Sequence, residues 1–200
     1  MITNEPIEIG FQIMETKEEA EKILLENGFI NIFKTAHTRD IYFGKDVNFE
    51  HKTEEEIKCS LIRLRGVSLF ENLQLLDKSF PEGKVFVDFK TAFSYVDRMF
   101  KEGYDVVFDT EKTDWIYEKG NCWHQLQDVK DVGLIDYVYS KDFAEIAKSK
   151  EEQFEMLKKH ITDLGLHLKY DLGIDKLRTL YYKQIKFSKD QTGAYAYQKK

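Results

Sequence analysis

Two arginines, two residues apart, are the strongest chemical signal in this chain of 200 residues. Arg63 and Arg65 lie in the run L-I-R-L-R, residues 61–65, where apolar and basic residues alternate. A period of two is typical of a β-strand and places both guanidinium groups on one face. Because a guanidinium group binds carboxylates and phosphates through parallel hydrogen bonds, this pair predicts an anion-binding face. The alternative is a solvated face of an ordinary sheet.

Lysines on or beside other predicted strands extend this set of basic side chains. Lys90 shares a strand face with Asp88 in segment 84–90, and Lys78 ends the segment 73–78. Basic groups that line a cavity offset the cost of removing a polyanion from water. We therefore expect five residues to bind a polyanion: Arg63, Arg65, Lys78, Lys90 and Lys112.

The segment 7–14, I-E-I-G-F-Q-I-M, predicts a strand with one apolar face. Its opposite face carries Glu8, Gly10 and Gln12. Glu8 is the one carboxylate there, and Mg²⁺ and Mn²⁺ prefer oxygen ligands.

Other chemistries find less support in the sequence. The five histidines show no zinc-like spacing with Cys59 and Cys122, and there is no P-loop, G-x-S-x-G or dinucleotide-binding glycine motif. His124 and Cys122 share one strand face, which favours a packed pair over a thiol nucleophile.

Helical periodicity predicts three helices, at residues 17–27, 92–102 and 150–164. Each follows a hydroxyl N-cap and precedes a glycine stop; the caps are Thr16, Thr91 and Ser149, and the stops Gly28, Gly103 and Gly165. Strand patterns fill the intervals, at 30–34, 38–43, 58–65, 73–78, 84–90, 106–110, 115–119, 122–126 and 135–139. Runs of strands between helices indicate an α+β fold with a mostly antiparallel sheet.

The chain contains an internal repeat. Residues 28–42 align without a gap on residues 103–117, at an offset of 75. Six of the fifteen positions are identical, including the glycine that ends each preceding helix. Two related halves would produce this pattern, and chance similarity is the alternative.

The motifs together resemble those of the CYTH family, the triphosphate tunnel enzymes, over about residues 7 to 185. The resemblance rests on the strand 7–14, on D-I-Y-F at 40–43, on the arginine pair and on the segment 126–139. It implies a tunnel-like antiparallel β-barrel of about eight strands with helices packed outside. Members of the family hydrolyse inorganic or organic triphosphates, or cyclise ATP as class IV adenylate cyclases, with Mg²⁺ or Mn²⁺.

The metal positions depart from the family pattern. The first strand reads E-x-G-x-Q where the family has E-x-E-x-K. The resemblance thus implies that Glu8 is the first metal ligand, while Gly10 and Gln12 replace a carboxylate and a lysine. Tyr137 and Tyr139 stand where paired glutamates are usual. Neutral phenols are poor ligands for Mg²⁺. The resemblance thus implies a cavity for triphosphate with a degraded metal site.

Composition and charge limit the remaining classes of protein to which the chain could belong. The formal charge of −6 argues against a general nucleic-acid binder, and no apolar run is long enough to span a membrane. Two cysteines and the absence of a leader pattern predict a cytoplasmic protein with reduced thiols. We expect one domain over residues 1–187 and a tail over 188–200.

Two functions remain open at this point. The first is a triphosphate-binding protein, a weak phosphohydrolase or adenylate-cyclase relative, in which Arg63 and Arg65 bind phosphate and Glu8 binds metal. The second is a non-catalytic CYTH-fold protein that binds an anionic metabolite or a protein partner. The arginine pair favours the first, and the missing carboxylates favour the second.

Overall fold

The computed structural model describes residues 5–45, 56, 59–68, 73–77 and 85–169, without the side chains of residues 34 and 35. Lys78 and the predicted tail lie outside the described residues. The chain divides into two compact units. Unit 1 draws on residues 1–35, 113–129 and 133–174, and unit 2 on residues 36–112, 130–132 and 175–200.

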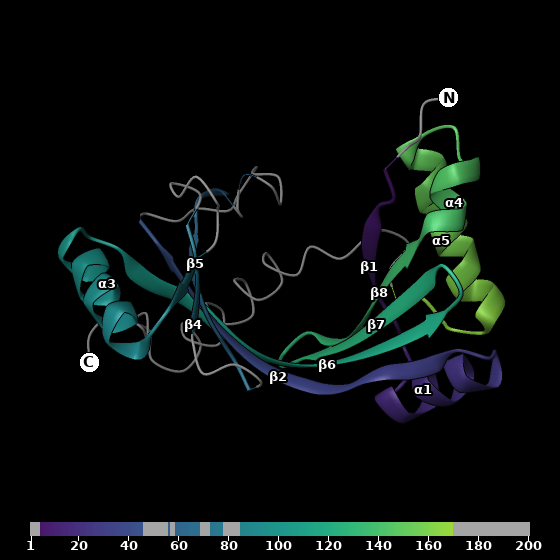
Figure 1. Ribbon diagram of the computed structural model, residues 1–200, viewed down its shortest axis with the longest axis horizontal. Helices are drawn as coiled ribbons and strands as arrows, with labels where there is room; N and C mark the ends of the chain where they lie inside the picture. The colour runs from purple at the N-terminus through teal and green to yellow at the C-terminus, as the bar shows by residue number, and fades with distance from the viewer. Residues whose placement is uncertain (1–4, 46–55, 57–58, 69–72, 78–84, 170–200) are drawn as a thin grey trace. The chain divides into compact units, whose positions relative to one another are not determined.

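The described elements are eight strands and four helices (Figure 1). In chain order they are β1 (Glu8–Gln12), α1 (Lys17–Glu26), β2 (Ile30–Gly44), β3 (Ile62–Val67), β4 (Leu73–Leu76), β5 (Val85–Val87), α3 (Phe89–Lys101), β6 (Asp105–Lys119), β7 (Cys122–Val129), β8 (Gly133–Ser140), α4 (Lys141–Ile146) and α5 (Lys150–Leu164). No helix among them is long and apolar enough to span a membrane.

The strands form one sheet in the order β1-β8-β7-β6-β2-β3-β4-β5. The pairs β1–β8, β7–β8, β2–β3, β3–β4 and β4–β5 are antiparallel. The predicted α+β fold with an antiparallel sheet of about eight strands is therefore confirmed. Within the described residues β1 and β5 are the ends of the strand order, so the sheet is not closed.

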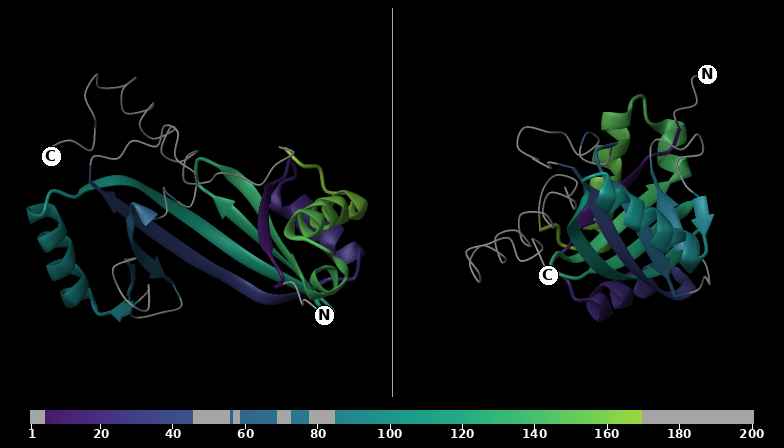
Figure 2. Two further views of the ribbon diagram at one scale, coloured as in Figure 1. Left: turned by 90° about the horizontal axis from the view of Figure 1, so that it is seen from above. Right: turned by 90° about the vertical axis from the view of Figure 1, so that its left-hand side faces the viewer.

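The topology repeats itself, as the sequence offset predicts. The unit β-α-β-β-β occurs twice, first as β1-α1-β2-β3-β4 and then as β5-α3-β6-β7-β8. Its helix stops, Gly28 and Gly103, have φ values of 83° and 85°, a left-handed conformation that suits glycine. The strands that follow, β2 and β6, each have 15 residues, and Figure 2 shows both as long continuous ribbons.

The long strands correct one part of the prediction. Segments 30–34 and 38–43 belong to one strand, β2, and segments 106–110 and 115–119 to another, β6. No glycine or proline interrupts either run before its end, so no residue forces a turn there. The patterns were two parts of the same strand.

The predicted start of α3, at residue 92, is also wrong. Asp88 is its N-cap and accepts a hydrogen bond of 2.7 Å from the Thr91 backbone N–H, so the helix begins at Phe89 and Thr91 lies inside it. An aspartate is a strong N-cap and here prevails over the continuing strand pattern. Lys90 therefore lies exposed in the first turn of a helix.

The start of α1 and the bounds of α5 are confirmed. Thr16 and Glu19 form a capping box at the start of α1, which ends at Glu26, one residue earlier than predicted. Ser149 caps α5 over Lys150–Leu164, and Gly165 ends it with a φ of 95°. These local signals act within a few residues of each helix end.

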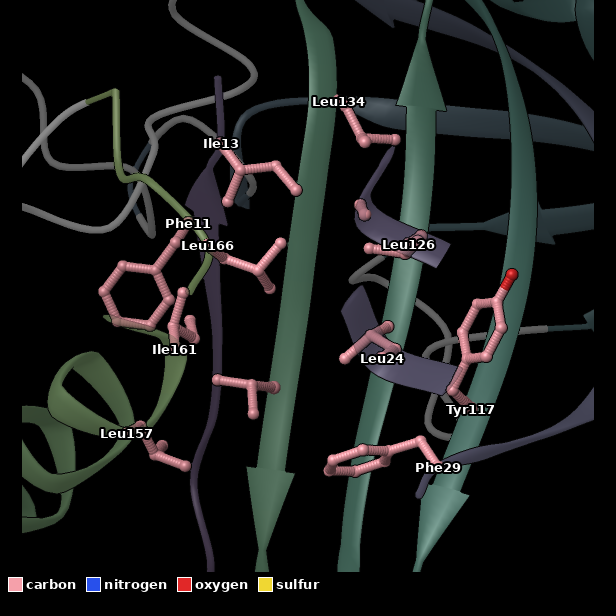
Figure 3. Close-up of a cluster of buried hydrophobic side chains, with 12 residues drawn as sticks. Phe11, Ile13, Leu24, Phe29, Tyr117, Leu126, Leu134, Leu157, Ile161 and Leu166 are labelled. Atoms are coloured by element: carbon pink, nitrogen blue, oxygen red, sulfur yellow. The ribbon is translucent and has the colours of Figure 1, made fainter. Parts of the chain in front are cut away.

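The larger core lies in unit 1, where α1 and α5 contribute side chains that pack with those of β1, β7 and β8 (Figure 3). Phe11 and Ile13 of β1 and its continuation are buried in it, and Ile7 and Ile9 pack against it, as the alternation predicts. Its fully enclosed members include Leu24, Tyr117, Leu126, Leu157 and Ile161. Unit 2 has a smaller cluster of Phe43, Ile62, Leu75 and Met99.

Candidate functional site

The pairing of β2 with β3 gathers the chemistry of unit 2 on one face. Asp40 is opposite Arg65, and Tyr42 is opposite Arg63. Because directly opposed residues of antiparallel strands share a face, these four side chains are neighbours. The strand β6, next to β2 in the sheet, adds Lys112.

The three cations converge on one carboxylate. Arg65 donates from Nε to Asp40 Oδ1 at 2.6 Å and from Nη2 to Oδ2 at 2.8 Å. The Lys112 Nζ lies 3.5 Å from Asp40 Oδ2, and the Arg63 Nη1 lies 3.9 Å from the same oxygen. We call Asp40, Arg63, Arg65 and Lys112 the cation cluster.

The side chains of the cation cluster are largely buried, so water screens their charges only weakly. The side chain of Asp40 is 1% exposed and that of Lys112 is 6% exposed, while Arg65 and Arg63 are 20% and 23% exposed. Three cations and one carboxylate sum to a formal charge of +2. The Nε of Arg63 is buried and donates no hydrogen bond. Charge interactions strengthen away from bulk water, so the contacts of these four side chains decide the ionisation of each.

The ionisation of the cluster follows from these contacts. Burial opposes the charged form of Asp40, but the hydrogen bonds from Arg65 and the charges of Lys112, Arg65 and Arg63 outweigh it, so the pKa of Asp40 lies below its ordinary value. Burial, followed by the charge of Asp40, raises the pKa of Tyr42 to about 12. Asp40 is therefore an anion and Tyr42 a neutral phenol at pH 7.

The structure brings together three of the five predicted ligand-binding residues, Arg63, Arg65 and Lys112. Lys90, on the first turn of α3, is not a member of the cluster, and Lys78 lies outside the described residues. Sequence analysis did not assign Asp40 as the shared counter-ion. Its signal was the alternation of Asp40 and Tyr42 in a strand that pairs with the arginine strand.

The described residues do not fit an octahedral Mg²⁺ or Mn²⁺ site at β1. Glu8 is exposed and opposite Tyr139, and Gly10 is opposite Tyr137. A Cβ atom added at Gly10 would lie 2.6 Å from Cε1 of Tyr137, so the phenol ring occupies the space that a second carboxylate would need. Mg²⁺ is held by carboxylates together with substrate phosphates, and on this face of β1 Glu8 is the one carboxylate.

Replacing Gly10 with alanine should therefore destabilise the protein by about 1–3 kcal/mol, as overpacking does in a filled site. The matched control is Gly66→Ala on β3, where the nearest atom to an added Cβ, Cδ2 of Leu73, lies at an ordinary 3.5 Å. That variant should be neutral or slightly stabilising. Urea unfolding measures both, and equal stabilities of the two variants would contradict the steric explanation.

Unit 1 holds a different group that could bind a metal, Cys122, His124 and His160. Burial lowers the pKa of His124, but the carboxylate of Asp136 outweighs burial and raises it to about 9. Burial, then the charge of His124, lowers the pKa of His160 to about 4. Sequence spacing missed this group because His160 comes from a helix 36 residues after His124.

Comparison with solved structures identifies the fold of this chain. No family model matches the chain, and no curated protein matches it in sequence. Among solved structures, the PH1819 protein of Pyrococcus horikoshii is 17% identical with a TM-score of 0.58, covering 90% of this chain and 99% of its own. A conserved hypothetical protein of Pyrococcus furiosus is 21% identical with a TM-score of 0.55, covering 88% and 98%.

A candidate adenylate cyclase of Vibrio parahaemolyticus also matches, at 13% identity and a TM-score of 0.53, covering 82% of this chain and 92% of its own. At these identities the likeness shows the fold alone. The chain therefore has the fold of these three proteins, and the presence of a candidate adenylate cyclase among them fits the predicted CYTH-like architecture.

Proposed function

We propose that this chain binds a triphosphate-containing molecule or another polyanion through the cation cluster of unit 2. The observation that carries the proposal is the convergence of Arg63, Arg65 and Lys112 on a single buried carboxylate, with a buried Nε of Arg63 that makes no hydrogen bond. Asp40 is bound mainly by Arg65, and the contact of Arg63 with Asp40 is 3.9 Å. An anion that binds beside Arg63 would therefore meet a cation that Asp40 does not fully pair.

Arg63 is the member best placed to recognise this anion. Its guanidinium group carries five N–H donors, and its Nε is buried and makes no hydrogen bond. Its contact with Asp40, at 3.9 Å, is longer than a hydrogen bond. A phosphate oxygen at this position would satisfy the buried donor and gain a charge-assisted bond. Arg65 donates to both oxygens of Asp40, so its guanidinium group is held in place and mainly lines the site.

We propose binding rather than efficient phosphoryl transfer as the activity. Tyr137 fills the space at Gly10, and Glu8 is the one carboxylate on its face of β1. The likeness to a candidate adenylate cyclase favours a nucleoside or inorganic triphosphate as the ligand class. A non-catalytic protein that binds an anionic metabolite or a protein partner is the second candidate, and the Gly10–Tyr137 contact is the observation in its favour.

Calorimetry with tripolyphosphate tests the proposal on the full chain. The wild type should bind, and Arg63→Gln should weaken binding by about tenfold or more, the value of one lost hydrogen bond to a charged group. The matched control is Arg98→Gln, an exposed arginine of α3 paired with Glu102, whose affinity should stay within about twofold of wild type.

Orthophosphate and ATP complete the experiment. Orthophosphate should bind more weakly than tripolyphosphate, because it carries fewer charges to the cluster. Equal affinity of ATP and tripolyphosphate would mean that the chain recognises phosphates alone, and tighter ATP binding would indicate a nucleotide ligand. The proposal fails if tripolyphosphate does not bind at millimolar concentration, or if Arg63→Gln and Arg98→Gln weaken binding equally.

A further inference from the structure

One thiol and two imidazoles that could bind a metal meet in unit 1. Cys122 and His124 are two residues apart on β7 and share one face of the sheet. His160 comes from α5, whose residues Leu157 and Ile161 belong to the core cluster of unit 1. The helix thus brings a second imidazole to the thiol and the first imidazole.

Two of the three distances between the donor atoms are those of ligands around one ion. His124 Nε2 lies 3.2 Å from His160 Nε2, and Cys122 Sγ lies 3.5 Å from the same nitrogen. All three donor atoms lie within 4.8 Å of one another. Zn–N bonds of about 2.0–2.1 Å and Zn–S bonds of about 2.3 Å, in a tetrahedron, separate two nitrogens by about 3.3 Å and nitrogen from sulfur by about 3.6 Å.

We propose that Cys122, His124 and His160 bind one Zn²⁺ ion, with a water molecule or another exogenous ligand in the fourth position. A thiolate with two imidazoles is a donor set that Zn²⁺ accepts readily and that Mg²⁺ and Mn²⁺ do not. The site is separate from the proposed polyanion function and does not depend on it.

The carboxylate behind His124 also supports a metal site. Asp136 Oδ2 lies 2.7 Å from His124 Nδ1, and both side chains are fully buried. A carboxylate on the Nδ1 side fixes the tautomer and directs the Nε2 lone pair to the other side of the ring, an arrangement common among histidines that bind zinc. The strand register explains this contact, because Asp136, Cys122 and His124 lie on the same face of the β7–β8 pair.

The surroundings of Asp136 fit the same arrangement. Its other oxygen, Oδ1, is buried and accepts no hydrogen bond. A carboxylate enclosed in this way is costly unless positive charge lies nearby. Either a proton on His124 or a divalent ion bound to its Nε2 would supply that charge.

Aromatic rings enclose the same residues. Phe29 meets His124 edge to face, with ring centroids 4.8 Å apart, and Phe143 meets His160 in the same way at 5.5 Å. An apolar surround limits water access and holds imidazole rings in place. Zn²⁺ bound here would join α5 to β7 and so stabilise unit 1.

The test begins with the full chain, made without a histidine tag, stripped by a chelator and reloaded with Zn²⁺. Elemental analysis after dialysis should find one zinc per chain, and the melting temperature should rise. Co²⁺ in place of Zn²⁺ should give the thiolate-to-cobalt charge-transfer absorption that identifies a cysteine ligand. A wild type that retains no zinc, or a cobalt complex without that absorption, would overturn the proposal.

Matched substitutions locate the site. Cys122→Ser and His160→Gln should abolish stoichiometric zinc, whereas Cys59→Ser and His167→Gln, at exposed positions, should retain it. Asp136→Asn should weaken zinc binding by about 10–100-fold, the usual effect of losing such a carboxylate. Retention of zinc by Cys122→Ser together with His160→Gln would place the metal elsewhere. If either of these two variants fails to fold, the stoichiometry and cobalt spectrum of the wild type decide the matter.

Discussion

Replacing Asp40 with asparagine should lower the free energy of unfolding by about 3–5 kcal/mol, the usual cost of removing one partner from a buried ion pair. Asp40 is the counter-ion of three cations, and the variant would leave Arg63, Arg65 and the buried Lys112 to repel one another. Urea unfolding at pH 7 measures the loss. The matched control is Asp109→Asn, which removes one ion-pair partner of the exposed Arg39 and should cost no more than about 1 kcal/mol.

The same variant separates the structural role of the cluster from its binding role. Tripolyphosphate should raise the melting temperature of Asp40→Asn more than that of the wild type, because the anion replaces the lost negative charge. A polyanion that stabilises both proteins equally would mean that it binds at another place. The proposal would then lose its support, although the stability loss of the variant would stand.

The pH dependence of this loss has a defined sign. The pKa of Asp40 is lowered in the folded state, so its stabilising effect is complete above the ordinary value of 3.8 and disappears as the pH falls through the lower folded value. The difference in stability between wild type and Asp40→Asn should therefore be constant near neutrality and shrink below pH 3.8. A difference that grows as the pH falls would contradict the assigned ion pairs.

Hydrolysis of tripolyphosphate or ATP with Mg²⁺ or Mn²⁺ should be very slow or absent. Its turnover should lie well below about 1 per second, the lower end of the range for ordinary enzymes. Catalysis of phosphoryl transfer is mainly positioning and charge stabilisation by metal ions. Glu8 is exposed on β1, and the ring of Tyr137 occupies the place of a second carboxylate. A metal ion carried by the phosphates would therefore be poorly fixed.

Phosphate release and cyclic nucleotide formation are the two measurements, since the fold neighbours include a candidate adenylate cyclase. Glu8→Gln is the informative variant. Any residual rate should stay within about twofold, because a lone exposed carboxylate contributes little to metal binding. A wild-type turnover of 1 per second or faster would show that carboxylates from other parts of the chain form the metal site.

Several features of the fold could be predicted from the sequence because their signals are local. The capping box of Thr16 and Glu19 and the cap and stop of α5 act within one or two turns, and they place the start of α1 and both ends of α5. The alternation of β1 identifies Phe11 as a core residue. The offset of 75 residues predicts the related helix stops at Gly28 and Gly103.

Local signals failed where two of them competed or where none was present. At Asp88 the strand alternation continues, but the Asp88 side chain caps a helix. Lys90 therefore lies in that helix and not in the predicted strand. In β2 and β6 the apolar pattern weakens midway while the strand continues, because pairing with neighbours holds the backbone extended. Length and pairing of a strand depend on residues far away in the chain.

The sites depended on contacts between distant segments. The arginine pair is visible as a pattern, yet only the register of β2 against β3 sets Asp40 opposite Arg65, and only β6 adds Lys112. The loss of a carboxylate at Gly10 is visible too, but the ring that fills the space comes from Tyr137 on β8. His160 reaches His124 because α5 packs on the sheet. Sequence determines which residues can do chemistry, whereas strand register and helix packing, which are set by burial of the whole core, decide which of them meet.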